Sequence, residues 1–215
     1  MNWLRGERKG MVSAGLLLLL GTGLAWAAAV WGPWVPAEPA ALQVLGVDMA
    51  EVVKFLPGVR SGDIAVWREG FLLPQVILSL FLSVHAWQRR WPWPWPWRLG
   101  MQALAFMVAL SMLPPAWTPA TLRAPEWQTQ VRLILFCALM AGMAPLWRWL
   151  PSWLGDGLLA LGGIGTGLWL VAALQRVWPQ FEMVYNTPLP YGWGLWALGV
   201  GITGLLILAG EHVRR

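Results

Sequence analysis

Two segments outside the apolar stretches carry polar side chains that could bind a charged ligand. The first segment ends in an aspartate, an arginine and a glutamate, and the second holds a glutamate, a tyrosine and an asparagine. Side chains of these types can hold a polar lipid headgroup through charge-assisted hydrogen bonds. The alternative is that they are ordinary surface residues of two loops. The candidate ligand site consists of Asp63, Arg68, Glu69, Glu182, Tyr185 and Asn186.

The segment RRWPWPWPWR, residues 89–98, combines three residue types with different chemistries. Alternating proline cannot continue a helix and favours a polyproline-like strap. Tryptophan prefers the boundary between lipid and water, and arginine there attracts anionic lipid. The segment resembles the antimicrobial peptide indolicidin, which implies affinity for the membrane interface. We predict a lipid-interface anchor, with a docking surface for a partner as the alternative. Its residues are Arg89, Arg90, Trp91, Trp93, Trp95, Trp97 and Arg98.

The sequence lacks the usual signatures of catalysis and metal binding. Cys137 is the single cysteine, which excludes an intrachain disulfide. The histidines, His85 and His212, are both expected near one membrane face, where histidine commonly meets water and headgroups. A bis-histidine haem site is the alternative for them. Neither a phosphate-binding loop nor a dinucleotide fingerprint occurs. We therefore expect no metal and no cofactor, and the sequence favours a non-catalytic protein over an enzyme, which stays open as an alternative.

The composition is that of an integral membrane protein. Of the 215 residues 58% are hydrophobic and 12% charged, with a mean hydropathy of +0.56. A soluble domain carries about 25% charged residues. The net charge of +5 is spread over segment ends rather than gathered in a stripe, which argues against a nucleic-acid partner. Only two of the 15 basic residues are lysines, a composition typical of a GC-rich bacterial genome.

Six apolar stretches are candidates for membrane spans. Backbone polar groups in lipid must bond within their own segment, so spans of this kind are helices. The first stretch could also be a signal peptide, but it is long enough to span. The sequence predicts an all-α fold, a single membrane domain over residues 1–215. The predicted spans are 11–31, 69–88, 99–115, 129–147, 154–175 and 191–210.

The distribution of basic residues sets the orientation, because cytoplasmic segments carry the excess. With both termini in the cytoplasm, the inner segments hold nine basic and three acidic residues, among them Asp156 and Glu211. The outer segments then hold six basic and seven acidic residues. This predicts a bacterial inner-membrane protein with both termini in the cytoplasm.

Two external loops follow from these spans. In the first, residues 32–68, Asp48 and Glu51 give a helix-start signal ahead of apolar residues at helical spacing. We expect there a short amphipathic helix that rests on the outer interface. Asp63 is expected to cap the second span, and Pro74 to kink it. The second external loop is expected over residues 175–194.

Small residues at four-residue spacing mark faces where helices can pack closely. Gly163 and Gly167 form one such pair, and Gly199 and Thr203 another. Such faces serve packing within the chain or contact with another chain. No Asp, Glu or Lys falls at the middle of a span, although ion-coupled transporters usually keep one there.

Two families share features of this topology. Six spans, a long first outer loop and the Trp67-Arg68 pair resemble the rhomboid proteases. That resemblance implies a Gly-x-Ser-Gly serine and a histidine in the last span, but span five reads GGIGTG and the last span has no histidine. The size and topology are also similar to the vitamin-binding components of energy-coupling-factor transporters.

Three functions remain open on these observations. The first is a non-catalytic membrane subunit or scaffold of a larger assembly, with membrane lipids and other membrane subunits as partners. The second is a small permease or a module that binds a lipid or another apolar ligand. The third is an enzyme acting on lipid-linked substrates at the outer face through Asp63, Glu69 and Glu182. A cavity between the outer loops would favour the second.

Overall fold

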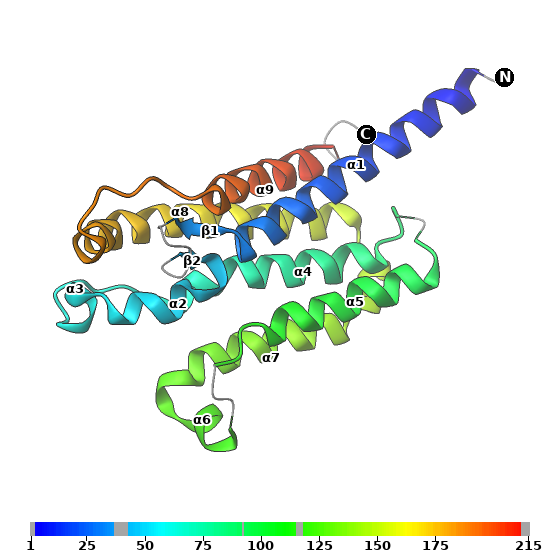
Figure 1. Ribbon diagram of the computed structural model, residues 1–215. Helices are drawn as coiled ribbons and strands as arrows, with labels where there is room; N and C mark the ends of the chain where they lie inside the picture. Colours follow the sequence, from blue (N-terminus) through cyan, green and yellow to red (C-terminus); the bar gives the residue numbers. More distant parts are fainter. Residues whose placement is uncertain (1–2, 37–42, 92, 115–117, 212–215) are drawn as a thin grey trace.

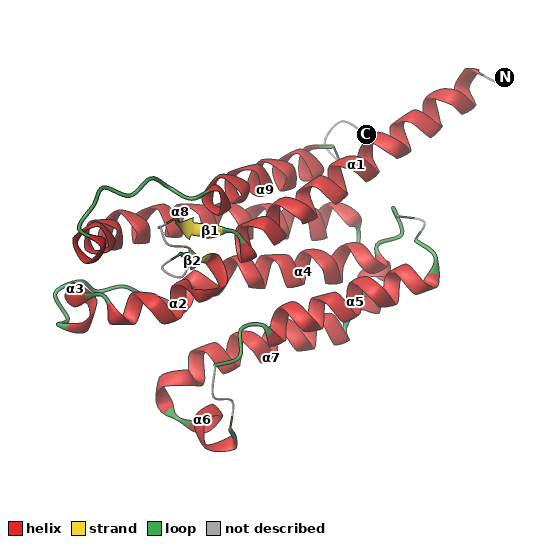
Figure 2. Cartoon of the chain, in the orientation of Figure 1, coloured by secondary structure: helices red, strands yellow, loops and turns green. Residues whose placement is uncertain are grey.

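Six long helices run back and forth along one direction (Figure 1). A computed structural model of the protein describes residues 3–36, 43–91, 93–114 and 118–211. Figure 2 shows how little of the described chain is strand. The predicted all-α class is confirmed. The long helices are α1 (Trp3–Trp31), α4 (Leu73–Trp87), α5 (Trp95–Leu110), α7 (Gln128–Gly142), α8 (Ser152–Tyr185) and α9 (Trp193–Gly210).

Helix α4 lies at the centre of this arrangement. It packs against α1, α5, α7 and α8, while α9 packs against α1 and α8, and α5 against α7. The most apolar stretch of α4, taken with the turn before it, is 83% buried, against 39% for α8 and 33% for α9. An apolar helix buried on all sides is a core helix. α8 and α9 instead turn much of their apolar surface outward.

Three helical segments are long and apolar enough to cross a bilayer: Arg68–Trp87, Ser152–Tyr185 and Trp193–Gly210. Gly15–Trp31 is a shorter apolar stretch within α1. Each of the six predicted spans overlaps one long helix. Both ends of the third shift, because α5 begins at Trp95 and ends at Leu110, whereas the predicted end at residue 115 lies outside the described residues.

Helix α8 is much longer than the predicted fifth span. Its 34 residues measure about 51 Å at 1.5 Å per residue, against about 30 Å for a bilayer core. The predicted loop over 175–194 is therefore helical as far as Tyr185. Pro179 is tolerated inside the helix, with Trp178 and Phe181 buried on either side of it. The helix ends where Asn186 adopts a left-handed conformation with φ of 51°.

The first outer segment folds back onto the helices. Strands β1 (Pro33–Val35) and β2 (Val44–Leu45) pair antiparallel, with Val35 opposite Val44. Trp34 is fully buried and its Nε1 donates to the Ala29 carbonyl at 2.7 Å. Gly46 permits this contact, because a Cβ there would lie 2.6 Å from Trp34 Nε1. Residues 37–42 of the first loop lie outside the described residues.

The expected short helix of the first loop is present at the predicted residues, but its apolar face is buried in the protein. A helical run combines the 3₁₀ turn Gly46–Asp48 (η2), α2 (Met49–Val52) and the 3₁₀ turn Val53–Phe55 (η3). Met49 and Val53 are fully buried in the main core. The apolar face therefore packs into the core of the protein instead of being exposed.

The start of the second predicted span differs in detail. Asp63 does not cap it: Asp63 Oδ2 accepts from Ser61 Oγ at 2.6 Å. The helical stretch begins with the 3₁₀ turn Arg68–Leu72 (η4), which leads into α4. Pro74 lies in the first turn of α4, where its missing N–H leaves no helical bond unmade. No kink is needed there. The remaining helices are short: α3 (Pro57–Arg60), α6 (Pro119–Arg123), and the 3₁₀ turns Pro125–Trp127 (η5) and Ala144–Trp149 (η6).

Candidate functional site

A cluster of charged and polar side chains is buried where α4, α8 and α9 meet at the end that holds the α4–α5 turn. We call it the inner cluster. Asp156 Oδ1 accepts from Gln88 Nε2 at 3.0 Å, and Asp156 Oδ2 accepts from Arg90 Nη1 at 3.3 Å. Arg90 also pairs with Glu211 at the end of α9. The inner cluster consists of His85, Gln88, Arg90, Asp156 and Glu211.

The side chain at the centre of the inner cluster is Asp156. It is 1% exposed, as are His85 and Gln88, while Glu211 at the edge is 32% exposed. A buried carboxylate is costly unless it is paired and hydrogen-bonded. Here the Arg90 guanidinium and the Gln88 amide donate to its two oxygens. The carboxylate is thus paired and hydrogen-bonded by side chains at and just after the end of α4.

His85 contacts the same carboxylate from α4. Its Nδ1 lies 2.9 Å from the Phe81 carbonyl, so Nδ1 carries a proton and donates. Its Nε2 lies 3.3 Å from Asp156 Oδ1, at ion-pair distance but without hydrogen-bond alignment. The imidazole thus lies between the Phe81 carbonyl of its own helix and the Asp156 carboxylate of α8.

Gly155 makes the inner cluster possible. A Cβ at this position would lie 2.8 Å from Gln88 Nε2 and 2.8 Å from Val84 Cγ1. Only glycine lets the start of α8 approach α4 closely enough for Asp156 to reach the end of that helix. This was missed from the sequence, where His85 was expected to meet water and headgroups and Asp156 was only counted among the acidic residues of the inner side. His212, the other histidine, lies outside the described residues.

The structure divides the Trp-Pro segment into two parts. Pro94 is extended, with φ of −65° and ψ of 153°, as predicted for a polyproline-like strap. The strap ends there, because α5 begins at Trp95 with Pro96 in its first turn, where proline is well tolerated. Pro92 lies outside the described residues. The prediction of a strap over the whole of 89–98 is thus wrong for its second half.

The four tryptophans of that segment have different surroundings. Trp91 is 4% exposed in the main core and contacts the position of Gly15 on α1. Trp93 is half-buried and its Nε1 donates to the His85 carbonyl at 3.1 Å. Trp95 and Trp97 are 60% and 63% exposed. Trp91 is therefore a core residue rather than a lipid contact, and Arg90 belongs to the inner cluster.

The six residues proposed at the outer face fall into separate contacts. Arg68 Nε pairs with Glu69 Oε1 at 2.9 Å, and the guanidinium lies over the Trp127 ring. Glu182 Oε1 accepts from the Leu189 backbone N–H at 3.3 Å, and the exposed Asn186 ends α8. Within the described residues, no hydrogen bond or ion pair joins Arg68 or Glu69 to Glu182 or Asn186. Asp63 contacts Ser61, and Tyr185 is half-buried near the end of α8.

The two predicted small-residue pairs have opposite surroundings. Gly163 and Gly167 lie against α9, where a Cβ would come within 2.9 Å of Leu205 and 2.6 Å of Ile202 respectively. Gly199 faces outward, with nothing within 4 Å of a Cβ, and Thr203 is exposed. α9 instead approaches α1 through other glycines, Gly201 against Trp26 and Gly204 against Thr22.

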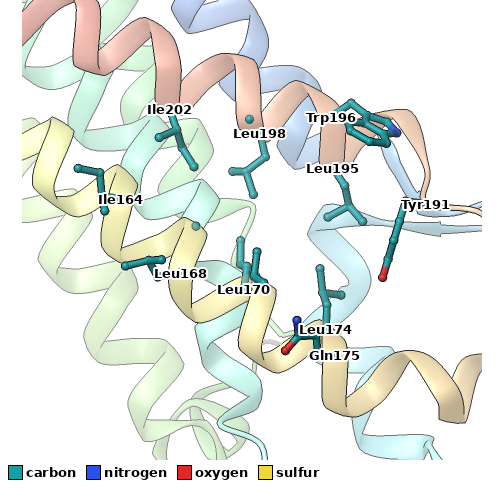
Figure 3. Close-up of a pocket in the computed structure, with 13 residues that line it drawn as sticks. Ile164, Leu168, Leu170, Leu174, Gln175, Tyr191, Leu195, Trp196, Leu198 and Ile202 are labelled. Carbon is teal, nitrogen blue, oxygen red and sulfur yellow. The ribbon is translucent and has the colours of Figure 1, made fainter.

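Two apolar grooves flank α9 on its outward side. The first, between α8 and α9, encloses about 510 Å³. Figure 3 shows Leu195 and Leu198 of α9 pointing toward α8, with Gln175 and Tyr191 at one end of the groove. The second, between α1 and α9, encloses about 660 Å³ and is lined by Gly21, Gly199 and Thr203 among others. Neither groove is lined by residues of the first loop, 32–68.

Comparison with known proteins finds no matching family model, no matching curated protein and no matching solved structure.

Proposed function

We propose that this chain is a non-catalytic integral subunit of a larger assembly in the bacterial inner membrane. It would cross the membrane six times as a single domain, with both termini in the cytoplasm. Successive long helices alternate in direction, which supports an even number of crossings. The basic residues gather at the end that holds the inner cluster, which supports a cytoplasmic location for that end.

The helices α5 and α7 are short for membrane spans, and a neighbouring turn extends one of them. Their 16 and 15 residues measure about 24 and 22 Å, less than a bilayer core of about 30 Å. The 3₁₀ turn η6 closely follows α7 and extends the apolar path at its inner end. Local thinning of the bilayer accommodates short spans at modest cost.

The observation that carries the proposal is the uncovered small-residue face of α9. Gly163, Gly201 and Gly204 each lie against a helix of the chain itself, but Gly199 does not. Gly199 and Thr203 line the groove between α1 and α9, and Gly21 lies across from them. Small residues of this kind let a second helix backbone come close in lipid. We propose that a transmembrane helix of another subunit occupies this groove.

Substitution of Gly199 tests this directly. Tagged chain is purified from native membranes in mild detergent and weighed by native mass spectrometry. Gly199→Leu should lose a partner that the unaltered chain retains, because the leucine fills the groove. Gly165→Leu is the matched control, since Gly165 on α8 also has nothing within 4 Å of a Cβ and lines neither groove. A monomer without partner in the unaltered chain, or equal loss in both variants, would overturn the proposal.

A second candidate function, binding of a lipid or another apolar ligand, is favoured by the groove between α8 and α9. Its 510 Å³ fall within the range of about 300–1,000 Å³ that is typical of small-molecule sites. Gln175 and Tyr191 supply polar groups at one end of an otherwise apolar wall.

Filling the groove separates this candidate from the first. Val171 is 57% exposed and lines the groove, so Val171→Trp should displace a bound apolar molecule that is detected by mass spectrometry of the purified chain. Leu161→Trp, at a residue that is 68% exposed and lines neither groove, is the control. Retention of the same molecule by both variants would count against this groove as a ligand site.

A further inference from the structure

Two arginines from different turns converge on one tryptophan at the inner end of the bundle. Arg89 follows α4, and Arg148 lies in η6 between α7 and α8. The Arg89 Cζ atom is 5.3 Å from the centroid of the Trp149 ring, and the Arg148 Cζ atom is 4.7 Å from it. The two guanidinium carbons therefore lie no more than about 10 Å apart, which is the sum of these distances and about one Debye length.

These two charges have no acidic partner among the side chains that the structure describes. The acids nearby at this end, Asp156 and Glu211, are bound by Arg90 in the inner cluster. Arg89 and Arg148 are both exposed, and their described contacts are with Trp149. Two like charges held this close leave a positive potential that an anion would relieve.

The surface beside the two guanidinium groups is apolar. Trp149 and Trp153 are 64% and 60% exposed. Leu146 and Leu150 are also exposed, at 50% and 44%. A cationic pair next to exposed leucine and tryptophan side chains matches a molecule with an anionic head and apolar tails. Free phosphate would match only the cationic part of this surface, because it has no apolar group.

We propose that Arg89, Arg148 and Trp149 form a binding site for an anionic phospholipid of the inner leaflet. The phosphodiester lies between the two guanidinium groups, and the acyl chains lie along Leu150 and Trp153. Arg90 takes no part, because Asp156 and Glu211 neutralise it. The leaflet assignment rests on the orientation in the proposed function, whereas the binding chemistry rests on the three side chains alone.

Lipid retention in detergent tests the site independently of orientation and of any partner. The full chain is mixed with phosphatidylglycerol or phosphatidylcholine in nonionic micelles, and bound lipid is measured by native mass spectrometry. The unaltered chain should prefer phosphatidylglycerol. The double variant Arg89→Ala/Arg148→Ala should bind it about 30-fold more weakly, as expected for the loss of two arginines near a membrane surface.

Three controls decide between outcomes. The double variant Arg132→Ala/Arg176→Ala removes two exposed arginines at the opposite end and should retain phosphatidylglycerol. Inorganic phosphate at millimolar concentration should fail to displace the lipid, and Trp153→Ser should weaken lipid binding without affecting any phosphate binding. Equal retention by both double variants, or full displacement by phosphate, would overturn the proposal. Partner retention by Arg89→Ala/Arg148→Ala reports separately on the proposed subunit function.

Discussion

His85 Nε2 lies 3.3 Å from Asp156 Oδ1, and both side chains are 1% exposed. The two residues belong to different helices, with the long helices α5 and α7 between them in the chain, so only the fold brings them together. Their contact, with Arg90 on the other carboxylate oxygen, fastens the end of α4 to the start of α8. We regard this pair as the main polar tie within the apolar bundle.

Replacement of Asp156 should be among the most damaging changes in the chain. Asp156→Leu leaves His85 and Gln88 buried without their carboxylate, and breaking a buried ionic pair costs about 3–5 kcal/mol. The double variant His85→Leu/Asp156→Leu should recover part of that loss. Glu211→Gln, at a residue that is 32% exposed, should cost about 1 kcal/mol or less. Denaturant-induced unfolding in micelles measures all three, and equal effects of Asp156→Leu and Glu211→Gln would contradict this assignment.

The two kinds of glycine on α9 should respond differently to the same substitution. Gly204→Leu places a side chain against Thr22 of α1, and such overpacking costs about 1–3 kcal/mol. Gly199→Leu meets open space and should change the free energy of unfolding by only about 0.5 kcal/mol. Thermal unfolding of the detergent-solubilised chain distinguishes them. A comparable loss in Gly199→Leu would mean that the face of α9 is covered within the chain.

Substitutions of two tryptophans in the Trp-Pro segment should differ in their effect on stability, because Trp91 is buried and Trp97 is exposed. Trp91→Ala empties a site in the core and should destabilise the fold by about 3–5 kcal/mol. Trp97→Ala, at a 63% exposed residue, should leave unfolding nearly unchanged. In a reconstituted bilayer, brominated lipids should quench the fluorescence of Trp97 more than that of Trp91. The reverse order of quenching would place the segment away from lipid.

The proposed orientation predicts which cysteines a membrane-impermeant maleimide can reach. Cys137 is fully buried and is the single native cysteine, so Cys137→Ala gives a clean background. Ser61→Cys, on the outer side, should be labelled in intact spheroplasts. Pro151→Cys, on the inner side, should be labelled only after permeabilisation. Both positions are exposed in the structure, and labelling in the opposite order would invert the topology.

The positions of the helices could be predicted from the sequence because they depend on local composition. Apolar stretches of sufficient length must become helices in lipid, and each predicted span overlaps a helix of the structure. Element ends were predicted less well. α8 extends to Tyr185 because Trp178 and Phe181 pack in the core, a stabilisation that a hydropathy pattern does not contain.

Nearly all of the inner cluster escaped prediction from the sequence. His85 lies in the last turn of α4 with Gln88 just after it, and Gly155 precedes Asp156 near the start of α8, which are the local signs of the cluster. Polar residues at span ends usually face water, so the pattern alone favours solvent for them. Their burial depends on the close approach of two helices that the chain does not place next to each other.

The sequence by itself determined the all-α class, the approximate place of each long helix and the asymmetry of basic residues, because all three follow from composition and periodicity along the chain. Only the tertiary structure decided which side of each helix is covered. It placed Trp91 in the core and Trp97 outside, covered Gly204 and left Gly199 open, and joined Arg90 to Asp156 while Arg89 remained exposed. The physical reason is that helices uniform in hydropathy carry no strong preference for one face, so packing between distant segments chooses it.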